Sequence, residues 1–283
     1  MDSNIATMLS RYQCKTAQDY EYALKEIIQE TALSGLARGG FFKQAAFTGG
    51  TALRIFYNLP RFSEDLDFSL LLPNPSFQLE AYLPTVKDEL ASVGFQMEVT
   101  GKKNQTQGPI QSAFLKENTL QLLLKFTPIT PPVTGIPASA VIRVKLEIDT
   151  NPPAGAKYEE KASFLPHPYI ARLLDAPSLF ATKLHAILAR GFLKGRDFYD
   201  YIFYLQRNVS VNLMLLENAL RQTGQWTNTE PLAIHDLQQL LLDKFKATDF
   251  QAAKTDVAPF IRNTNELFAW SKELFIDSVQ RLC

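Results

Sequence analysis

The stretch "FTGGTALR" (47–54), followed by "SEDLDFSLLL" (63–72), decides which fold we expect of this chain. A short apolar run leads to Gly49 and Gly50, and the residues after the two glycines favour a helix that ends before Pro60. The second stretch alternates as a strand with one buried face does. We therefore predict a strand, a tight turn, a helix and a second strand.

The second strand is expected to carry two carboxylates on one side of the sheet. Its period of two places Asp65, Asp67 and Ser69 on one face and the apolar residues between them on the other. The aspartates are then roughly 6.6 Å apart along the backbone, close enough to reach one divalent ion or a pair of ions. Such hard oxygen ligands suit Mg²⁺ or Mn²⁺, with substrate phosphates completing the shell.

The two glycines fit a phosphate site at the start of the predicted helix. Without Cβ atoms they let backbone N–H groups approach phosphate oxygens, and a helix N-terminus favours negative charge. Thr51 can supply a hydroxyl to the same ligand. Further candidate phosphate contacts are Arg54, Arg61 and Ser63.

A later strand, "AVIRVKLEID" (140–149), has the clearest alternation in the chain and offers a third acidic group. Its polar face includes Lys145, Glu147 and Asp149. Geometry alone allows either Glu147 or Asp149 to complete a metal site with the two aspartates. An ordinary strand with its outer face in water would show the same pattern.

A second cluster is expected in the C-terminal half, where nearly every segment favours a helix. On a helical wheel over 176–190, Lys183 and Arg190 fall together at one margin of the apolar face. The next helix, in "KGRDFYDYIFYL", opens with Asp197 and Asp200. The helix dipole alone also favours Asp near a helix start, so this pair has a structural explanation as well.

The complete pattern predicts an α+β domain followed by a helical domain. We divide the chain at the end of the loop "TNPPAGAKYEEKASFLPHP" (150–168), into 1–168 and 169–283. Further helices are predicted over 17–38, 77–94, 196–207, 211–222, 231–246 and 264–282, further strands over 95–99, 112–116 and 120–126, and a Pro-rich loop over 127–139.

Composition narrows the class of protein. The 283 residues are 46% hydrophobic, enough for one large domain or two modest ones. The 29 basic and 29 acidic side chains cancel, so no field of the whole protein draws it to nucleic acid or to an anionic membrane. No segment indicates export or membrane spanning, and we expect a cytoplasmic protein. Two cysteines, three scattered histidines and no P-loop motif argue against a disulfide framework, a zinc enzyme and a P-loop NTPase.

Four segments together resemble the AbiEii-type nucleotidyltransferase toxins, a branch of the DNA polymerase beta-like superfamily. They are "FTGGTALR", "RFSEDLDFSL", "VKLEID" and "KLHAILARGFLKGRDFYD". The resemblance implies a polymerase-beta-like nucleotidyltransferase fold: a mixed sheet flanked by helices, then a helical C-terminal domain, with an NTP held in the cleft between them.

The resemblance also implies roles for the candidate residues. The family's Lys-x-Glu pattern favours Glu147 as the third acidic group, and its Arg-Asp-x-x-Asp signature matches both Asp197 and Asp200. The candidate set is Asp65, Asp67, Lys183 and Asp197 as catalytic residues, Gly49, Gly50, Thr51, Arg54, Arg61, Ser63, Lys145, Arg196 and Asp200 as nucleotide-binding residues, and Asp65, Asp67, Glu147 and Asp149 as metal ligands.

The implied reaction is nucleotidyl transfer with Mg²⁺ or Mn²⁺. A metal-activated hydroxyl attacks the α-phosphorus of an NTP, pyrophosphate leaves, and the metal ions and Lys183 neutralise the developing charge. The implied partners are an NTP, an antitoxin encoded alongside and, for some members, a tRNA 3′ end as acceptor. The local basic residues Lys102, Lys103, Lys194 and Arg196 could meet RNA or only solvent. Two alternatives keep the fold: a small-molecule nucleotidyltransferase of the antibiotic-modifying kind, and a non-catalytic partner-binding protein.

Overall fold

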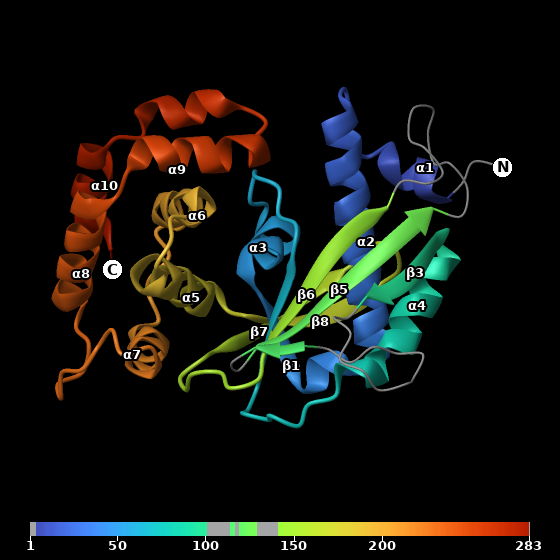
Figure 1. Ribbon diagram of the computed structural model, residues 1–283, viewed down its shortest axis with the longest axis horizontal. Coiled ribbons are helices and arrows are strands. Elements are labelled where there is room, and N and C mark those ends of the chain that lie inside the picture. Colours follow the sequence, from blue (N-terminus) through green and yellow to red (C-terminus); the bar gives the residue numbers. More distant parts are fainter. Residues whose placement is uncertain (1–3, 101–113, 117–118, 129–140, 283) are drawn as a thin grey trace. The chain divides into compact units, whose positions relative to one another are not determined.

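The computed structural model describes residues 4–100, 114–116, 119–128 and 141–282 (Figure 1). Lys102, Lys103 and most of the predicted loop over 127–139 lie outside the described residues. The chain divides into two compact units, each of which is described by itself. The sheet unit comprises Met1–Phe56, Ser63–Pro152 and Glu160–Leu173, and the helical unit comprises Tyr57–Phe62, Pro153–Glu159 and Leu174–Cys283.

An eight-stranded mixed sheet is the framework of the sheet unit. The strands are β1 (Ala45–Thr48), β2 (Leu66–Leu70), β3 (Phe95–Thr100), β4 (Phe114–Lys116), β5 (Thr119–Pro128), β6 (Ile142–Asp149), β7 (Tyr158–Ser163) and β8 (Tyr169–Leu174). Their order is β3-β5-β6-β2-β1-β8-β7, with β4 paired to β5. β1 is antiparallel to β2, whereas β2 is parallel to β6 and β1 is parallel to β8. The prediction of a mixed sheet flanked by helices is therefore confirmed.

The strands that carry the candidate carboxylates have one buried face, as their alternation predicts. In β2 and β6 the apolar residues are buried, while the charged residues between them are exposed or half-buried. The aromatic rings of Phe41, Phe47 and Phe68 pack together on the buried side of β1 and β2. This packing fixes the direction of the polar face.

Most of the helices of the sheet unit lie within predicted segments. They are α1 (Asn4–Leu9), α2 (Ala17–Arg38), α3 (Gly49–Tyr57) and α4 (Leu83–Ser92). Thr16 and Asp19 form a capping box that starts α2, and Gly39 ends it. Pro84 lies in the first turn of α4, where proline is tolerated. The short α1 was not predicted.

The helical unit contains α5 (Ala176–Ala189), α6 (Gly195–Gln206), α7 (Leu213–Gln222), α8 (Ile234–Ala247), α9 (Phe250–Val257) and α10 (Lys272–Ser278). The prediction of one helix over 264–282 was wrong. Trp270 and Ser271 are extended, and the hydroxyl of Ser271 accepts a hydrogen bond from Leu274 N at 3.1 Å, which starts α10 as a new helix.

The predicted loop over 150–168 was also wrong in part, because it contains β7. Every second residue of β7 is exposed and its side chains are mostly polar, so the hydrophobic alternation of an ordinary strand is missing. The next strand, β8, pairs with β1 in the sheet unit, and the compact units divide after Leu173. The domains 1–168 and 169–283 stay a prediction.

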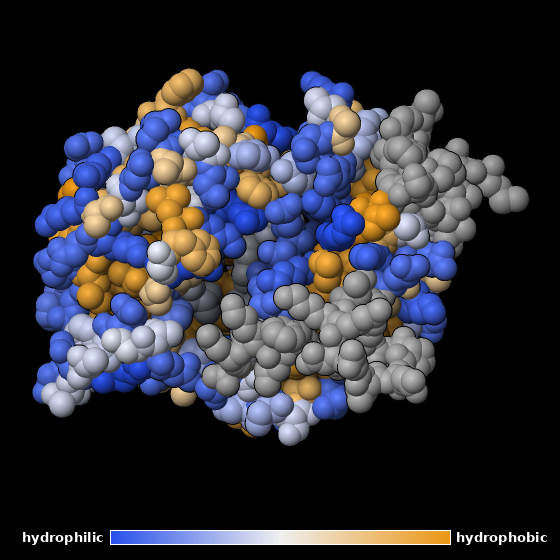
Figure 2. Space-filling model, in the orientation of Figure 1, coloured by the Kyte–Doolittle hydropathy of each residue, from blue (hydrophilic) through white to orange (hydrophobic). Residues whose placement is uncertain are grey.

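Hydrophilic residues cover most of the face shown in Figure 2, with smaller groups of hydrophobic residues among them. Among the described helices, none combines the length and the hydropathy that a membrane span requires.

Candidate active site

The bend after β1 brings the start of α3 against the carboxylate of Asp67. Gly49 has a φ of +76°, a left-handed conformation that glycine adopts without strain. A Cβ atom at this position would lie 2.2 Å from Asp67 Oδ2. Glycine is therefore needed for this carboxylate to lie so close to the helix N-terminus, and the predicted tight turn is confirmed.

Asp67 and Glu147 occupy the same level of two neighbouring strands. The parallel register of β2 and β6 pairs Asp67 with Glu147, and Ser69 with Asp149. Residues paired in this way lie about 5 Å apart and point to the same face of the sheet. Both carboxylates are half-buried. Of the two acidic residues that the sequence left open, Glu147 is the one beside Asp67.

The two acidic residues of β6 have different local partners. Glu147 forms an ion pair with Lys145 and accepts a hydrogen bond from Gln121 Nε2 at 2.7 Å. Asp149 Oδ1 accepts a hydrogen bond from Asn151 N at 2.9 Å, as in an Asx turn. Burial raises the pKa of Asp149, and this backbone bond opposes the shift. Asp149, the last residue of β6, thus stabilises the turn that follows the strand.

Two of the predicted phosphate contacts in the sheet unit have protein partners. Thr51 is fully buried, and its hydroxyl donates a hydrogen bond to the carbonyl oxygen of Asp65. This bond fixes the backbone immediately before β2. Arg54 Nε donates to Glu26 Oε2 at 2.8 Å, and both side chains are less than one fifth exposed. Ser63 is half-buried, and its carbonyl oxygen accepts a hydrogen bond from Gln29 Nε2 at 3.1 Å.

A preformed metal site of three or more ligands is absent from the residues that the structure describes. A site for Mg²⁺ does not require one, since this ion is often held by one or two carboxylates together with substrate phosphates. The paired Asp67 and Glu147 fit that smaller requirement, and the absence of a Cβ at Gly49 makes the space that the Asp67 carboxylate occupies. The metal-binding roles of Asp65, Asp67, Glu147 and Asp149 stay predictions.

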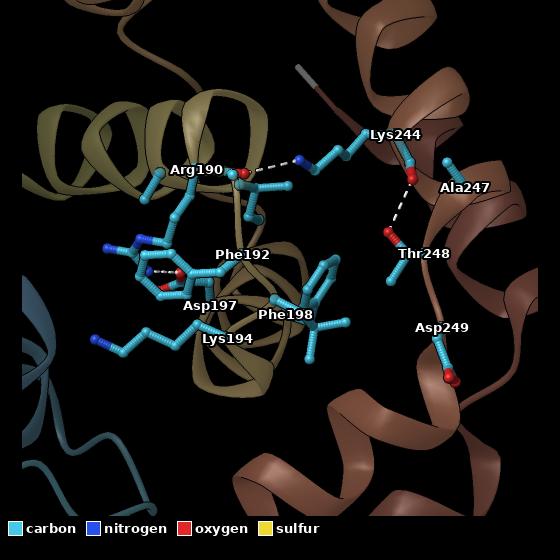
Figure 3. Close-up of a pocket in the computed structure, with 13 residues that line it drawn as sticks. Arg190, Phe192, Lys194, Asp197, Phe198, Lys244, Ala247, Thr248 and Asp249 are labelled. Atoms are coloured by element: carbon cyan, nitrogen blue, oxygen red, sulfur yellow. Dashed lines mark hydrogen bonds and ion pairs between the residues drawn. The ribbon is translucent and has the colours of Figure 1, made fainter.

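In the helical unit, α5 and α6 bring together a buried network of charges. Lys183 Nζ lies 2.8 Å from Asp197 Oδ1 and 2.8 Å from Asp200 Oδ2. Arg190, from the end of α5, forms an ion pair with the other carboxylate oxygen of Asp197 (Figure 3). The Asp197 and Asp200 side chains are at most 4% exposed, so these charges interact largely out of water.

The network favours the charged forms of Lys183 and Asp197. Burial lowers the pKa of Lys183, but the carboxylates of Asp197 and Asp200 outweigh burial and hold this pKa above its ordinary value. Burial likewise raises the pKa of Asp197, but Lys183 and Arg190 hold it below its ordinary value. Lys183 is therefore an ammonium ion at neutral pH, suited to neutralise negative charge rather than to accept a proton.

Arg61 completes this network from a distant part of the sequence. Its Nε and Nη2 donate to the two oxygens of Asp200, each at 2.6 Å, and Nη1 donates to the carbonyl oxygen of Phe62 at 2.8 Å. The side chain is 2% exposed. A phosphate contact by Arg61, as the sequence predicts, would require this bidentate pair to break. The structure thus gives Arg61 a partner that sequence reasoning missed.

Two further basic residues at the start of α6, Arg196 and Lys194, are not part of this network of ion pairs. The guanidinium of Arg196 stacks on the ring of Phe260, 4.1 Å from its centroid. Lys194 forms no ion pair within the described part of the chain. Burial and the neighbouring Arg196, Lys183 and Arg190 lower the pKa of Lys194, because positive charge is in excess around it.

The family described as "Nucleotidyl transferase AbiEii toxin, Type IV TA system" matches residues 31–274, which is most of the chain. The chain belongs to the AbiEii nucleotidyltransferase toxin family. The AbiEii match includes both the glycine bend of the sheet unit and the charge network of the helical unit. The protein is thus a nucleotidyltransferase, the family generally uses an NTP and a divalent metal, and the type IV system implies an antitoxin partner.

Solved structures share the fold of this AbiEii protein. MenT4, a nucleotidyltransferase toxin of Mycobacterium tuberculosis H37Rv, is 19% identical, with a TM-score of 0.54 over 97% of this chain and 98% of that chain. JHP933 from Helicobacter pylori is 18% identical, with a TM-score of 0.54 over 94% of this chain and 92% of that chain. No curated protein sequence matches the chain.

The candidate residues of this AbiEii toxin fall into two groups. The sheet unit holds Gly49, Gly50, Thr51, Arg54, Ser63, Asp65, Asp67, Lys145, Glu147 and Asp149, and the helical unit holds Arg61, Lys183, Arg196, Asp197 and Asp200. Within the first group the structure brings Gly49, Asp67 and Glu147 together. Within the second it brings Arg61, Lys183, Asp197 and Asp200 together. The catalytic and nucleotide-binding roles of all these residues stay predictions.

Proposed function

We propose that this protein transfers a nucleoside monophosphate from an NTP to a hydroxyl group of RNA, such as a tRNA 3′ end, as the toxin of a toxin–antitoxin pair. The observation that carries this proposal is the in-register placement of Asp67 and Glu147 beside the Gly49 bend. Carboxylates next to a glycine-started helix are the arrangement that holds a cation and a phosphate chain together.

The proposed chemistry is an in-line displacement at the α-phosphorus. A bond forms between the acceptor hydroxyl oxygen and the α-phosphorus, the bond from that phosphorus to the pyrophosphate oxygen breaks, and the hydroxyl proton passes to water. Backbone N–H groups at the start of α3 bind phosphate oxygens, because a helix N-terminus presents N–H groups without intrahelical partners and favours negative charge. Lys183 is held as an ammonium ion, which is the charge state that its proposed role of neutralising negative charge in the reaction requires.

Asp67 and Glu147 would hold the divalent metal ion, which is Mg²⁺ or Mn²⁺ in this proposal. When bound, such an ion supplies Lewis-acid stabilisation of the phosphoryl oxygens. Asp65 precedes β2 directly, and the bond from the buried Thr51 fixes its backbone. Cytoplasmic localisation is part of the proposal, because NTPs and tRNA are found there.

The experiment that tests the proposal measures label transfer. Purified protein is incubated with each α-labelled NTP in turn, Mg²⁺ or Mn²⁺, and total RNA. We expect labelled RNA with at least one NTP, and its loss when EDTA removes the metal. If no NTP of the four labels the RNA, under conditions in which a known transferase works, the proposed reaction is refuted.

Variants in the same assay assign the carboxylates. Asp67→Asn and Glu147→Gln should each lower the transfer rate by about a hundredfold or more, since each removes a predicted metal ligand. Asp149→Asn is the matched control, because Asp149 pairs with Ser69 and accepts a hydrogen bond from Asn151 N. This variant should lower the transfer rate by about tenfold or less. Equal losses for Glu147→Gln and Asp149→Asn would contradict the assignment from register.

A further inference from the structure

A pocket opens in the helical unit beside the charge network (Figure 3). It has a volume of about 330 Å³ and is lined by the end of α5, the start of α6, the end of α8 and the segments that follow α5 and α8. This volume is at the lower end of the range for small-ligand sites, so it suits one nucleotide unit rather than a large ligand. Asp197 is among its lining residues and connects it to Lys183.

The pocket carries an excess of positive charge. Its cations are Arg190, Lys194 and Lys244, and its carboxylates are Asp197 and Asp249. Asp197 already pairs with Lys183 as well as with Arg190. Asp249 caps the start of α9, where its Oδ1 accepts hydrogen bonds from Gln251 N and Ala252 N. An anion could therefore meet cations that the lining carboxylates do not neutralise.

Lys244 and Arg190 are held in place by protein partners, whereas Lys194 is available to bind an anion. Lys244 Nζ donates to the carbonyl oxygen of Arg190 at 3.2 Å, which ties α8 to the end of α5 (Figure 3). Arg190 is held by Asp197. Lys194 has no ion pair within the described residues, and its neighbouring cations favour an incoming anion.

An exposed aromatic ring lies next to the cations. Phe192 is 68% exposed, although it lines the pocket, and the guanidinium of Arg190 lies 5.2 Å from the centroid of its ring. An exposed ring beside cations is the combination by which proteins hold single-stranded nucleic acid, with a base stacked on the ring and the phosphate on the cations.

We propose that this pocket holds one nucleotide of a single-stranded RNA acceptor, its base on Phe192 and its phosphate at Lys194 and Arg190. The inference rests on the proposed function and specifies the part of the acceptor that is recognised. A base-paired nucleotide has no free face for the ring, so the pocket selects an unpaired strand or end. Inorganic phosphate alone would use the cations but not the ring.

Binding of a labelled RNA tests the proposal independently of catalysis. The probe is a short single-stranded RNA of mixed sequence, labelled at its 5′ end and titrated with full-length protein in EDTA, with fluorescence anisotropy as the readout. Phe192→Ala should weaken binding by about fivefold to a hundredfold, the range for loss of a stacking aromatic side chain. Lys194→Ala should weaken binding by about threefold or more and make it less sensitive to salt.

The matched control is Lys246→Ala. Lys246→Ala removes the same charge as Lys194→Ala, but Lys246 is on α8, its side chain is 61% exposed and it does not line the pocket. The Lys246→Ala protein should bind the RNA with an affinity within about twofold of that of the unaltered protein, since Lys246 does not line the pocket. Folding of each variant is checked by the fluorescence of Trp226 and Trp270, which are both buried in the helical unit.

The outcomes separate this inference from the proposed function. A duplex of the same RNA with its complementary strand is titrated in parallel. The inference fails if Phe192→Ala and Lys194→Ala bind the single strand like Lys246→Ala, if the duplex binds as well as the single strand, or if the unaltered protein does not bind RNA. In each case label transfer by the unaltered protein would leave the proposed function standing. Weakened binding by both variants, without label transfer by the unaltered protein, would instead support the pocket and refute the reaction.

Discussion

At the scale of single residues, Gly49 couples backbone conformation to the position of a carboxylate. Its left-handed φ and its contact with Asp67 are two separate requirements at one position. A side chain at Gly49 would therefore both strain the backbone and displace the Asp67 carboxylate. The backbone strain would lower the stability of the fold, and the displacement of the carboxylate would disturb the candidate active site.

Gly49→Ala should abolish most transfer activity and destabilise the fold. Alanine in a left-handed conformation costs about 1–2 kcal/mol, and its Cβ cannot remain 2.2 Å from Asp67 Oδ2. Gly40→Ala is the matched control, because Gly40 has a φ of +79° but no neighbour closer than 3.8 Å to its added Cβ. It should lose similar stability in urea and keep its transfer rate. Equal activities for the two variants would show that the contact with Asp67 has no catalytic consequence.

Arg61 and Asp200 form the most buried ion pair of the described helical unit. Arg61→Met should lower the free energy of unfolding by about 3–5 kcal/mol, since it leaves Asp200 with Lys183 alone. Asp200→Asn should cost at least as much, because Arg61, Lys183 and Arg190 would then share only the charge of Asp197. Urea denaturation followed by tryptophan fluorescence measures both. A loss below about 1 kcal/mol for Arg61→Met would mean that the pair contributes little net stability.

At the scale of elements, the sequence predicts strands by their alternation but not by their neighbours. The period of two in β6 correctly placed Lys145, Glu147 and Asp149 on the polar face. It could not decide between Glu147 and Asp149, because that choice depends on the register between β2 and β6. Register follows from the packing of the whole sheet.

The elements that were not predicted from the sequence differ in their local signals. β7 is largely polar, and only its place at the sheet edge makes it a strand. α9, in contrast, has a local signal, since Asp249 caps the helix and is followed by helix formers. The Arg61–Asp200 pair joins residues 139 positions apart, a contact that no local pattern contains.

α2 contains a carboxyl group that makes stability depend on pH. Glu30 is 7% exposed, its Oε2 has no hydrogen-bond partner in the described structure, and burial raises its pKa to about 8. Below its ordinary pKa of 4.5, Glu30 is protonated in both folded and unfolded states. As pH rises to about 8, the unfolded chain releases this proton first, so the native state loses stability over that window.

Glu30→Gln should remove this loss, because glutamine is neutral at every pH. The variant should exceed the unaltered protein in unfolding free energy by on the order of 3 kcal/mol near pH 8, with the difference shrinking towards pH 5. Circular dichroism in urea at several pH values measures it. Glu21→Gln, on the same helix but with a 52% exposed side chain, should change stability by about 0.5 kcal/mol or less at every pH. A constant difference for Glu30→Gln across the pH range would contradict a protonated Glu30.

At the scale of the whole molecule, the two compact units are interleaved along the chain. The helical unit takes residues 57–62 and 153–159 from within the sequence of the sheet unit. The first segment supplies Arg61 to Asp200, and the second supplies the carbonyl oxygen of Gly155, which accepts a hydrogen bond from Asn212 Nδ2 at 2.8 Å. The helical unit is therefore incomplete if the chain is simply cut where the helices begin.

A fragment of residues 174–283 should not fold like the same residues in the full chain. It would leave the buried Asp200 without Arg61 and would expose the apolar surface that the two missing segments cover. We expect a broad, non-cooperative urea transition in tryptophan fluorescence, whereas the full chain should give a steep one. Arg61→Met in the full chain is the control, since it removes the charge pair but keeps both segments. A cooperative transition for the fragment, with a midpoint near that of the full chain, would show that the helices from α5 onward form an independent domain.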